Sequence, residues 1–230
     1  MVILYDPQYT SGGFDERFAA LLETFVFRHG GGVCFVASNK YSEGILVGGR
    51  RGAFGPLANV LPVTLGPMDD VFLERLRQGR RRSFSVTLTP AGRSHRLTRL
   101  VPLAEASARI WTAQLADVYW SHPVKEAKSG ARVLATHAER RTDRKRLEPV
   151  LAVQSYGKGR TVYLGTDETW RWRLLKHGQY HRRFWFNVVD YLAMLAGKRV
   201  RISAAGDRFD VGERIRLRLE AYDAEFQGRK

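Results

Sequence analysis

The sequence contains very little cysteine: Cys34 is the only one among 230 residues. A single thiol excludes an intramolecular disulfide, and no Cys and His residues have the spacing of a structural zinc site. The chain also lacks any apolar run near the roughly 20 residues that a membrane-spanning helix needs. Its start, MVILYDP, has neither the charged segment nor the long apolar segment of a signal peptide. We therefore expect the chain as given to be soluble.

Acidic residues are also scarce, with 23 Asp and Glu against 38 Lys and Arg, a net charge of +15. Such an excess favours polyanionic partners: nucleic acid, anionic lipid headgroups or acidic proteins. The candidate basic patches are Arg80–Arg82, Arg140–Arg146 and Arg182–Arg183. The basic residues are spread along the chain, however, and no helix-turn-helix or RNP motif accompanies them. Specific nucleic-acid binding is therefore not favoured.

Metal and nucleotide motifs are missing as well. His177 and His181 lie four residues apart, a spacing that can place two metal ligands on one helical face, but no HExxH arrangement surrounds them. We interpret them as two exposed, solvated histidines. The Gly-Lys-Gly-Arg segment 157–160 lies between two predicted strands rather than between a strand and a helix, so it predicts a hairpin turn instead of a phosphate loop. We expect no cofactor.

The N-terminal third alternates strand and helix patterns. Val2–Tyr5 and Val33–Ala37 are apolar strand patterns, and Asp15–Arg28 between them has the three- and four-residue apolar spacing of a helix. This order predicts a parallel βαβ crossover. Residues 39–68 indicate a long loop with one short strand near Val60–Thr64, and Asp69–Arg77 predicts a short helix.

The rest of the main domain continues the pattern. An irregular stretch leads to Trp111, and a charged loop at Glu139–Arg146 forms the end of a predicted hairpin. The further strands and the last helix are predicted at Phe84–Leu88, Ala131–Ala135, Val150–Gln154, Thr161–Leu164 and Tyr180–Leu195. The sequence therefore predicts an α/β fold with three layers and a mostly parallel sheet.

A short all-β extension is predicted to follow. Val200–Ser203 and Ile215–Ala221 alternate apolar and charged residues, as the opening strands of an immunoglobulin-like β-sandwich do, but the chain is too short to complete one. We predict a domain at 1–197 and the truncated start of a second at 198–230. A strand pattern at the first residues and another near the last suggest an excerpt from a longer polypeptide.

One stretch carries a family resemblance. The sequence YGKGR, an apolar strand, GTDETWRWR and the helix FWFNVVDYLA resemble the glutamine amidotransferase-like domains of large bacterial membrane proteins that also carry von Willebrand factor A modules. FVFRHGGGVCFVASNKY and LTPAGRSHRLTRL are similar to earlier steps of that family. The resemblance covers roughly the first 200 residues and implies a flavodoxin-like, class I amidotransferase-like fold. It also implies a membrane-associated parent protein, whose side of the membrane stays open.

The resemblance directs attention to the catalytic positions. Class I amidotransferases need an exposed cysteine on a G-x-C-x-G turn, with a His and a Glu after a later strand. Cys34 lies instead within VCFVA, so we predict a buried structural thiol. By its position after the Gly-Gly-Gly step, the turn is expected near Ala37 or Ser38, and Thr166, Asp167 and Glu168 replace the family's His-x-Glu step.

Three functions follow as hypotheses. The leading one is a non-catalytic, amidotransferase-like interaction or scaffold module, a pseudoenzyme, that binds a partner protein or other domains of its parent. The second is a degenerate hydrolase that uses Ser38 with Asp167 or Glu168. The favoured structural alternative for these two carboxylates is ion pairing and helix capping beside the Trp170–Arg173 segment, which itself indicates a packed corner. The third hypothesis is a basic surface that binds nucleic acid or anionic lipid nonspecifically.

Overall fold

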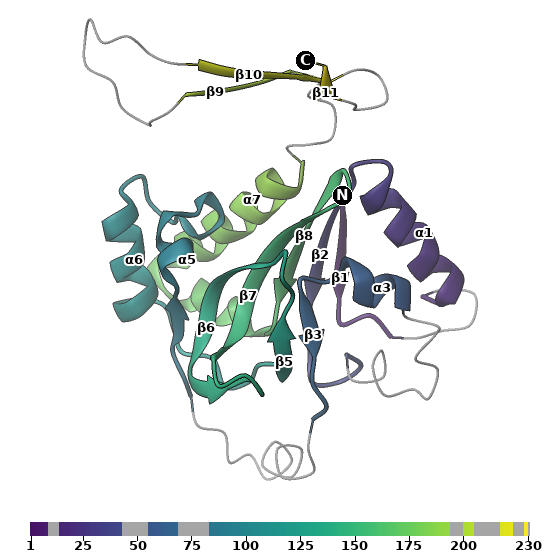
Figure 1. The fold of residues 1–230 in the computed structure, drawn as a ribbon. Coiled ribbons are helices and arrows are strands. Elements are labelled where there is room, and N and C mark those ends of the chain that lie inside the picture. Colours follow the sequence, from purple (N-terminus) through teal and green to yellow (C-terminus); the bar gives the residue numbers. More distant parts are fainter. Residues whose placement is uncertain are drawn as a thin grey trace, which may run out of the picture.

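The computed structural model describes residues 1–8, 14–42, 55–68 and 83–193, and the backbone of 200–204, 217–222 and 228–229. Its centre is a six-stranded sheet with the strand order β1-β2-β8-β7-β6-β4 (Figure 1). The strands are β1 (Val2–Tyr5), β2 (Gly32–Val36), β4 (Val86–Leu88), β6 (Arg132–Arg141), β7 (Leu147–Tyr156) and β8 (Gly159–Leu164). Strands 2–5, 33–37, 150–154 and 161–164 are thus confirmed within a residue or a few.

The sheet is mixed, and the prediction of a mostly parallel sheet is wrong. β1, β2 and β8 run parallel, as the predicted βαβ crossover requires, but the pairings β8–β7, β7–β6 and β6–β4 are antiparallel. The reason lies in the connections, because tight turns join β6 to β7 and β7 to β8. A tight turn reverses the chain, whereas a parallel neighbour needs a long crossover.

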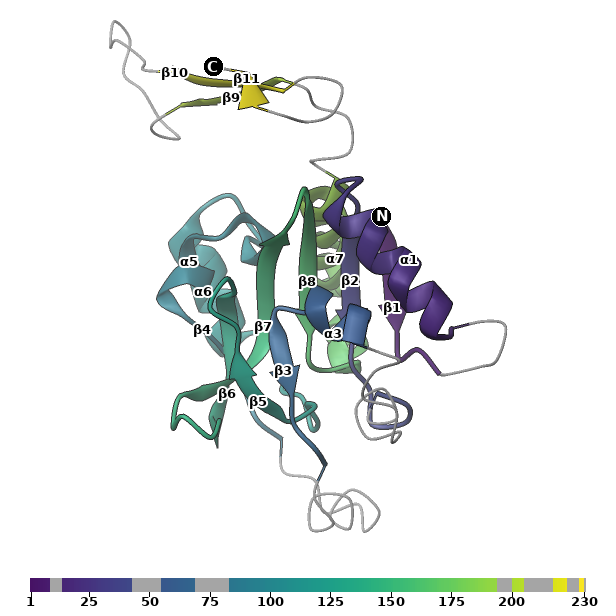
Figure 2. The same cartoon turned by 45° about the vertical axis from the view of Figure 1, so that its right-hand side comes forward.

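Helices cover both faces of the sheet, which gives the predicted three layers (Figure 2). One face carries α1 (Glu16–Phe27) and α3 (Gly55–Val60), and the other carries α5 (Pro90–Ser94), α6 (Ala104–Ala113) and α7 (Gln179–Ala193). β2 shows the alternation directly: Val33 and Phe35 pack into the α1 core, and Cys34 and Val36 into the α7 core. Side chains in a strand alternate between faces, so one buried strand supports two cores.

Local signals explain the helices that the sequence predicted. Asp15 precedes α1, and its side chain accepts a hydrogen bond from the Phe18 backbone N–H at 2.9 Å, the geometry of an N-cap. The helix ends at Phe27, and Gly30 follows with a φ of 70°, a left-handed conformation that glycine adopts readily. α7 begins one residue before its predicted start.

Several elements were not predicted. α3, α5 and α6 occupy segments that we expected to be irregular, and β5 (Val124–Ala127) pairs with β3 (Val63–Leu65) in a separate two-stranded sheet. Short 3-10 helices complete the fold: η1 (Arg96–Thr98), η2 (Glu168–Leu174) and η3 (Lys176–Gly178). The helix predicted at 69–77 and the basic patch at 80–82 lie outside the described residues.

The C-terminal strands form a three-stranded antiparallel sheet: β9 (Val200–Ala204), β10 (Leu217–Tyr222) and β11 (Gly228–Arg229). The strands expected near 200–203 and 215–221 are therefore confirmed. This sheet shares no paired strand with the six-stranded sheet. Its assignment to a second domain at 198–230 stays a prediction. In the described part of the chain, no helix combines the length and the apolar character needed to cross a bilayer.

Candidate functional site

The three parallel strands end at one edge of the sheet, the lower edge in Figure 1. A polar residue follows each of them: Asp6 follows β1, Ser38 lies two residues after β2, and Asp167 lies three residues after β8. The carboxyl end of parallel strands is where ligands bind in open α/β sheets. We call Asp6, Ser38, Ser42 and Asp167 the carboxyl-end cluster.

Asp6 organises the loop that follows β2. Its backbone φ is 43°, an uncommon value for a residue other than glycine, and its N–H donates to the Val36 carbonyl at 3.0 Å. One carboxylate oxygen, Oδ1, accepts from the Tyr41 N–H at 3.1 Å and from the Ser42 hydroxyl at 3.0 Å. The aspartate therefore ties the end of β1 to the loop, and these hydrogen bonds offset its unfavourable backbone conformation.

Ser38 and Asp167, predicted as a pair, come together here. Burial raises the pKa of the Asp167 carboxyl, a hydrogen bond from Ser38 acts in the opposite direction, and the negative charges of Glu168 and Asp6 raise it again. The Ser38 backbone N–H donates to the Ser42 hydroxyl at 2.9 Å. Only 5% of Ser38 is exposed, so its hydroxyl lies under the loop rather than on an open turn.

Glu168 is directed elsewhere. Its carboxylate accepts a hydrogen bond from the Tyr119 backbone N–H, and its own N–H donates to the Thr166 hydroxyl at 3.1 Å. The structure therefore brings Asp167, but not Glu168, to Ser38. The expected helix cap is wrong for Asp167, because this residue precedes η2 without a side-chain capping bond.

The packed corner predicted for Trp170–Arg173 is confirmed for Trp172 and Arg171 only, because Trp170 and Arg173 are exposed. Trp172 is buried, and its indole N–H donates to the Ala116 carbonyl at 3.1 Å. The Arg171 guanidinium lies over the Tyr119 ring, 4.5 Å from its centroid. Trp170, by contrast, keeps 50% of its surface exposed.

Cys34 is a buried structural thiol, as predicted. It lies in the middle of β2 with no exposed surface, and burial raises its pKa to about 12. The nucleophilic form of cysteine is the thiolate, and enzymes lower the thiol pKa to obtain it. The environment of Cys34 does the opposite, because burial raises the pKa of its thiol.

His122 lies beside the cluster and was not predicted. Its backbone N–H donates to the Gly165 carbonyl at 2.7 Å, which places it at the end of β8. The ring Nδ1 lies 2.9 Å from the Pro123 carbonyl oxygen. A carbonyl only accepts, so Nδ1 carries the proton and Nε2 is left as an acceptor. Within the described residues, Nε2 is buried without a hydrogen-bond partner.

The charge state of His122 follows from its surroundings. Burial lowers its pKa to about 4, and the positive charge of Arg140 acts in the same direction. The Pro123 hydrogen bond and the negative charge of Asp6 act against this shift. The imidazole is therefore neutral at pH 7. Its only local signal was a His-Pro step between two apolar segments, which is too common to single out a residue.

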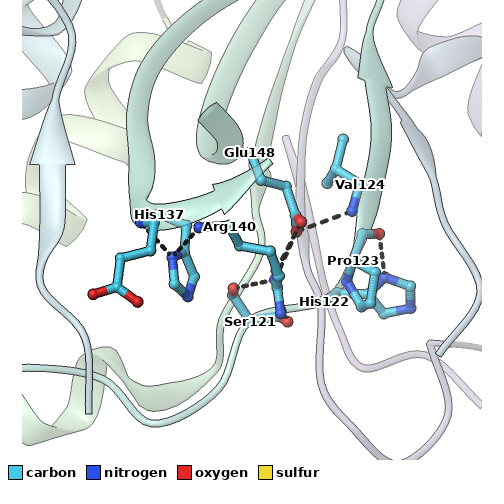
Figure 3. Close-up of polar contacts among 8 residues, drawn as sticks. Ser121, His122, Pro123, Val124, His137, Arg140 and Glu148 are labelled. Carbon is cyan, nitrogen blue, oxygen red and sulfur yellow. Dashed lines mark hydrogen bonds and ion pairs between the residues drawn. The ribbon is translucent and has the colours of Figure 1, made fainter. Parts of the chain in front are cut away.

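An inner ion pair supports the segment that carries His122 (Figure 3). Arg140 donates to both carboxylate oxygens of Glu148, at 2.7 and 2.6 Å, and its Nη2 also reaches the Ser121 carbonyl at 2.8 Å. Glu148 in turn accepts from the Val124 N–H at 3.0 Å. Burial raises the pKa of the Glu148 carboxyl, although Arg140 and the Val124 bond oppose that shift.

This pair corrects the predicted basic patch at 140–146. Arg140 points inward to a carboxylate because Glu148 follows on the paired strand β7, so its charge is neutralised rather than offered to a polyanion. Arg144 forms an exposed ion pair with Glu126 at 2.9 Å. The patch therefore presents less free positive charge than its sequence indicates.

The structure also places the two histidines and the Gly-Lys-Gly-Arg segment that the sequence analysis considered. His177 has a φ of 53° and precedes α7, so it does not share a helical face with His181. His177 is exposed as expected, whereas His181 is only partly exposed and lies against Trp185, with ring centroids 6.4 Å apart. The described residues hold no group of three or more His, Cys, Asp or Glu arranged to bind a metal. The Gly-Lys-Gly-Arg segment is the predicted hairpin turn between β7 and β8.

Comparison with known proteins gives limited information. No known protein family and no curated protein matches the sequence. Two cytoplasmic proteins of Salmonella typhimurium are similar in structure: STM1381 at 16% identity and TM-score 0.48, and STM3548 at 15% and 0.44, each over 83% of this chain and 70% of the other. A cold-adapted β-galactosidase from Rahnella shares 20% identity over 90% of this chain and 25% of its own, with a TM-score of 0.39. Similarity at this level assigns neither a function nor a finer fold family.

Proposed function

We propose that this chain is a non-catalytic interaction module with a flavodoxin-like, class I amidotransferase-like fold, part of a larger membrane-associated bacterial protein. One observation carries the proposal: the only thiol, Cys34, is fully buried inside β2 with its pKa raised to about 12. Amidotransferase chemistry needs that thiol exposed and ionised. The sequence resemblance supports the family, and the buried thiol supports a role without its chemistry.

A surface suited to a partner accompanies the buried site. Large apolar side chains are exposed on η2 and α7, with exposed fractions of 50% for Trp170, 74% for Leu174 and 59% for Phe186. Exposed arginines lie on the same two elements, and Arg183 lies over the Phe186 ring, 5.5 Å from its centroid. Aromatic residues and arginine are enriched at the centres of protein interfaces. This η2–α7 surface fits a protein partner with acidic groups around an apolar centre.

Site-specific crosslinking in the natural host tests the proposal. A photoreactive p-benzoylphenylalanine replaces Leu174 or Phe186 in the full-length protein. Leu21 on α1 and Leu103 just before α6 serve as controls, because they are exposed by 62% and 59% away from η2 and α7. We expect the same partner to be crosslinked from positions 174 and 186 and not from the controls. Equal adducts from all four positions, or none from 174 and 186, would remove the η2–α7 surface as the interaction site.

A second function, hydrolysis of an ester or amide, is favoured by one specific contact. Ser38 lies close enough to Asp167 to lower the pKa of that carboxyl, and a carboxylate is the base that a serine nucleophile would need. Glu168 is not part of this pair, because it binds the Tyr119 backbone. The burial of Ser38 opposes the hydrolase, since a substrate must reach the hydroxyl.

Matched substitutions separate the two functions. The hydrolysis of glutamine and of p-nitrophenyl acetate is measured for the wild type and for Ser38→Ala and Asp167→Asn. The controls are Ser129→Ala and Asp143→Asn, which remove the same groups from exposed positions. A non-catalytic module predicts the same background rate for all five proteins. A rate that falls only with the first two substitutions would establish the hydrolase.

A further inference from the structure

A groove lies between α5 and α6, on elements that the carboxyl-end cluster does not use. Its volume is about 520 Å³. Pockets for small ligands typically enclose roughly 300–1,000 Å³ and have mostly apolar walls with a few polar groups. Four of its lining residues are apolar, namely Leu88 at the end of β4, Pro90 on α5, and Ala104 and Ala108 on α6. Alanines at two of these positions leave the space open.

The α5 wall of the groove is fixed to the sheet. The Thr89 hydroxyl donates to the Val133 carbonyl at 2.7 Å and accepts from the Gly92 N–H at 3.0 Å, so it caps α5 and anchors it. Gly92 lies directly on β6, where an added Cβ would be only 1.9 Å from the Leu134 carbonyl oxygen. The helix therefore cannot slide into the groove and close it.

Hydrogen bonds of Thr98 connect α6, the other wall of the groove, to α5. The Thr98 carbonyl accepts from the Ser107 hydroxyl at 3.0 Å and from the Trp111 indole N–H at 2.8 Å, and both donors belong to α6. The Thr98 hydroxyl donates to the Gly92 carbonyl on α5 at 2.5 Å. Thr98 thus links the two walls through buried hydrogen bonds. The groove is preformed, and a ligand need not spend binding energy to open it.

The charges at the groove select the ligand. Arg93 from α5 and Arg109 from α6 both line it and are exposed, and among the described residues neither guanidinium has an ion-pair or hydrogen-bond partner. Glu105 is the one carboxylate in the lining, so the groove carries two positive charges and one negative. Unpaired guanidinium groups bind carboxylates through paired hydrogen bonds. An apolar floor below such groups fits an amphipathic anion.

We propose that this groove binds a small amphipathic carboxylate, such as a medium-chain fatty acid. Its apolar chain lies on Leu88 and Ala108, and its carboxylate contacts Arg93 and Arg109. The proposal is independent of the interaction surface on η2 and α7, because it uses different residues and a different kind of ligand.

A fluorescent fatty acid, 11-(dansylamino)undecanoic acid, provides the test. We expect saturable binding of one probe per chain to the wild-type protein, with a rise in dansyl emission. The double substitution Arg93→Gln with Arg109→Gln weakens binding about tenfold, a modest factor because the guanidiniums are exposed to solvent. Ala108→Trp fills the groove and prevents saturable binding. Arg93 and Arg109 are both exposed, so the double glutamine variant should fold even if Ala108→Trp does not.

Two controls separate the groove from general attraction to a basic protein. Arg17→Gln with Arg28→Gln removes the same charge from exposed positions on α1 and just after it, and should leave the affinity within a factor of two or so of the wild type. N-undecyl dansylamide, which has no carboxylate, should bind the wild type weakly and should not distinguish the arginine variants. Equal weakening by both double substitutions, or the absence of saturable binding, would overturn the proposal.

Discussion

Replacing Gly92 by alanine gives opposite predictions from local propensity and from packing. Gly92 lies in α5, and alanine is favoured over glycine in a helix by about 1 kcal/mol. In the fold, the new Cβ would lie 1.9 Å from the Leu134 carbonyl oxygen and 2.8 Å from its carbonyl carbon. Both are backbone atoms of β6, which cannot rotate away as a side chain can. We therefore expect the substitution to destabilise the protein.

The size of the effect follows from the contacts that must shift. Overpacking of this kind costs about 1–3 kcal/mol, and moving α5 away from β6 also weakens the Thr89 and Thr98 hydrogen bonds, each worth about 1 kcal/mol. If both hydrogen bonds are lost, and after the propensity gain of about 1 kcal/mol, the net loss of unfolding free energy is about 2–4 kcal/mol. In a chain of this size, 1 kcal/mol corresponds to about 2–4 °C, so Tm falls by roughly 4–16 °C.

Urea unfolding followed by circular dichroism and tryptophan fluorescence measures the loss. Gly130→Ala is the matched control, because its added Cβ would meet nothing within 4 Å. We expect this control to change stability by less than about 0.5 kcal/mol. If Gly92→Ala proves as stable as the wild type or more stable, the close approach of α5 to β6 is wrong, and with it the preformed wall of the groove.

Three further predictions concern buried groups. Arg140→Ala leaves the Glu148 carboxylate buried without its cation and should cost about 3–5 kcal/mol in urea unfolding at neutral pH, with a smaller cost once acid protonates Glu148. Burial lowers the pKa of His122 from 6.5 to about 4, so its contribution to stability is complete above pH 6.5 and is lost as the pH falls toward 4. The slope is about 1.4 kcal/mol per pH unit, and His122→Asn, which keeps a donor for the Pro123 carbonyl, should remove it. The Cys34 thiol should not react with dithionitrobenzoate at pH 8 until denaturant unfolds the protein, and rapid labelling of the native protein would contradict its burial.

The sequence predicted those elements whose signals are local. α1 has an N-cap aspartate and regular apolar spacing, and the β7–β8 hairpin has turn glycines between two apolar strands. α5 has a local signal as well, a Thr cap followed by proline, but it lies in the segment that we expected to be irregular, and it contains Gly92. The glycine is present for a tertiary reason, the contact with Leu134, which no periodicity shows.

The residues of the candidate site differ in the same way: local signals predict some of them, and tertiary contacts alone position the others. Ser38 and Asp167 could be paired from the sequence because each follows a recognisable strand of the same parallel set. His122 could not, since its position depends on a hydrogen bond to Gly165 and on the support of Arg140, neither of which is close in sequence. The hairpins that join β6 to β7 and β7 to β8 were predicted, and they explain why the expectation of a mostly parallel sheet was wrong: a hairpin makes its two strands antiparallel.

The hydrogen bonds of the two sites point to different roles. In the carboxyl-end cluster, Asp6 accepts from Tyr41 and Ser42, and the Ser38 N–H donates to the Ser42 hydroxyl, so these polar groups satisfy one another and hold the loop in place. Such a cluster offsets the backbone conformation of Asp6 and leaves little for a substrate to bind. The groove between α5 and α6 has the reverse character, because its buried hydrogen bonds fix the two walls in place while the guanidiniums of Arg93 and Arg109 have no partner in the described part of the chain. A polar group with a hydrogen-bond partner inside the protein stabilises the fold. A polar group without such a partner, next to the apolar lining of an open groove, is available to a ligand. By this criterion we expect a ligand in the groove, whereas Asp6 and Ser38 serve the fold.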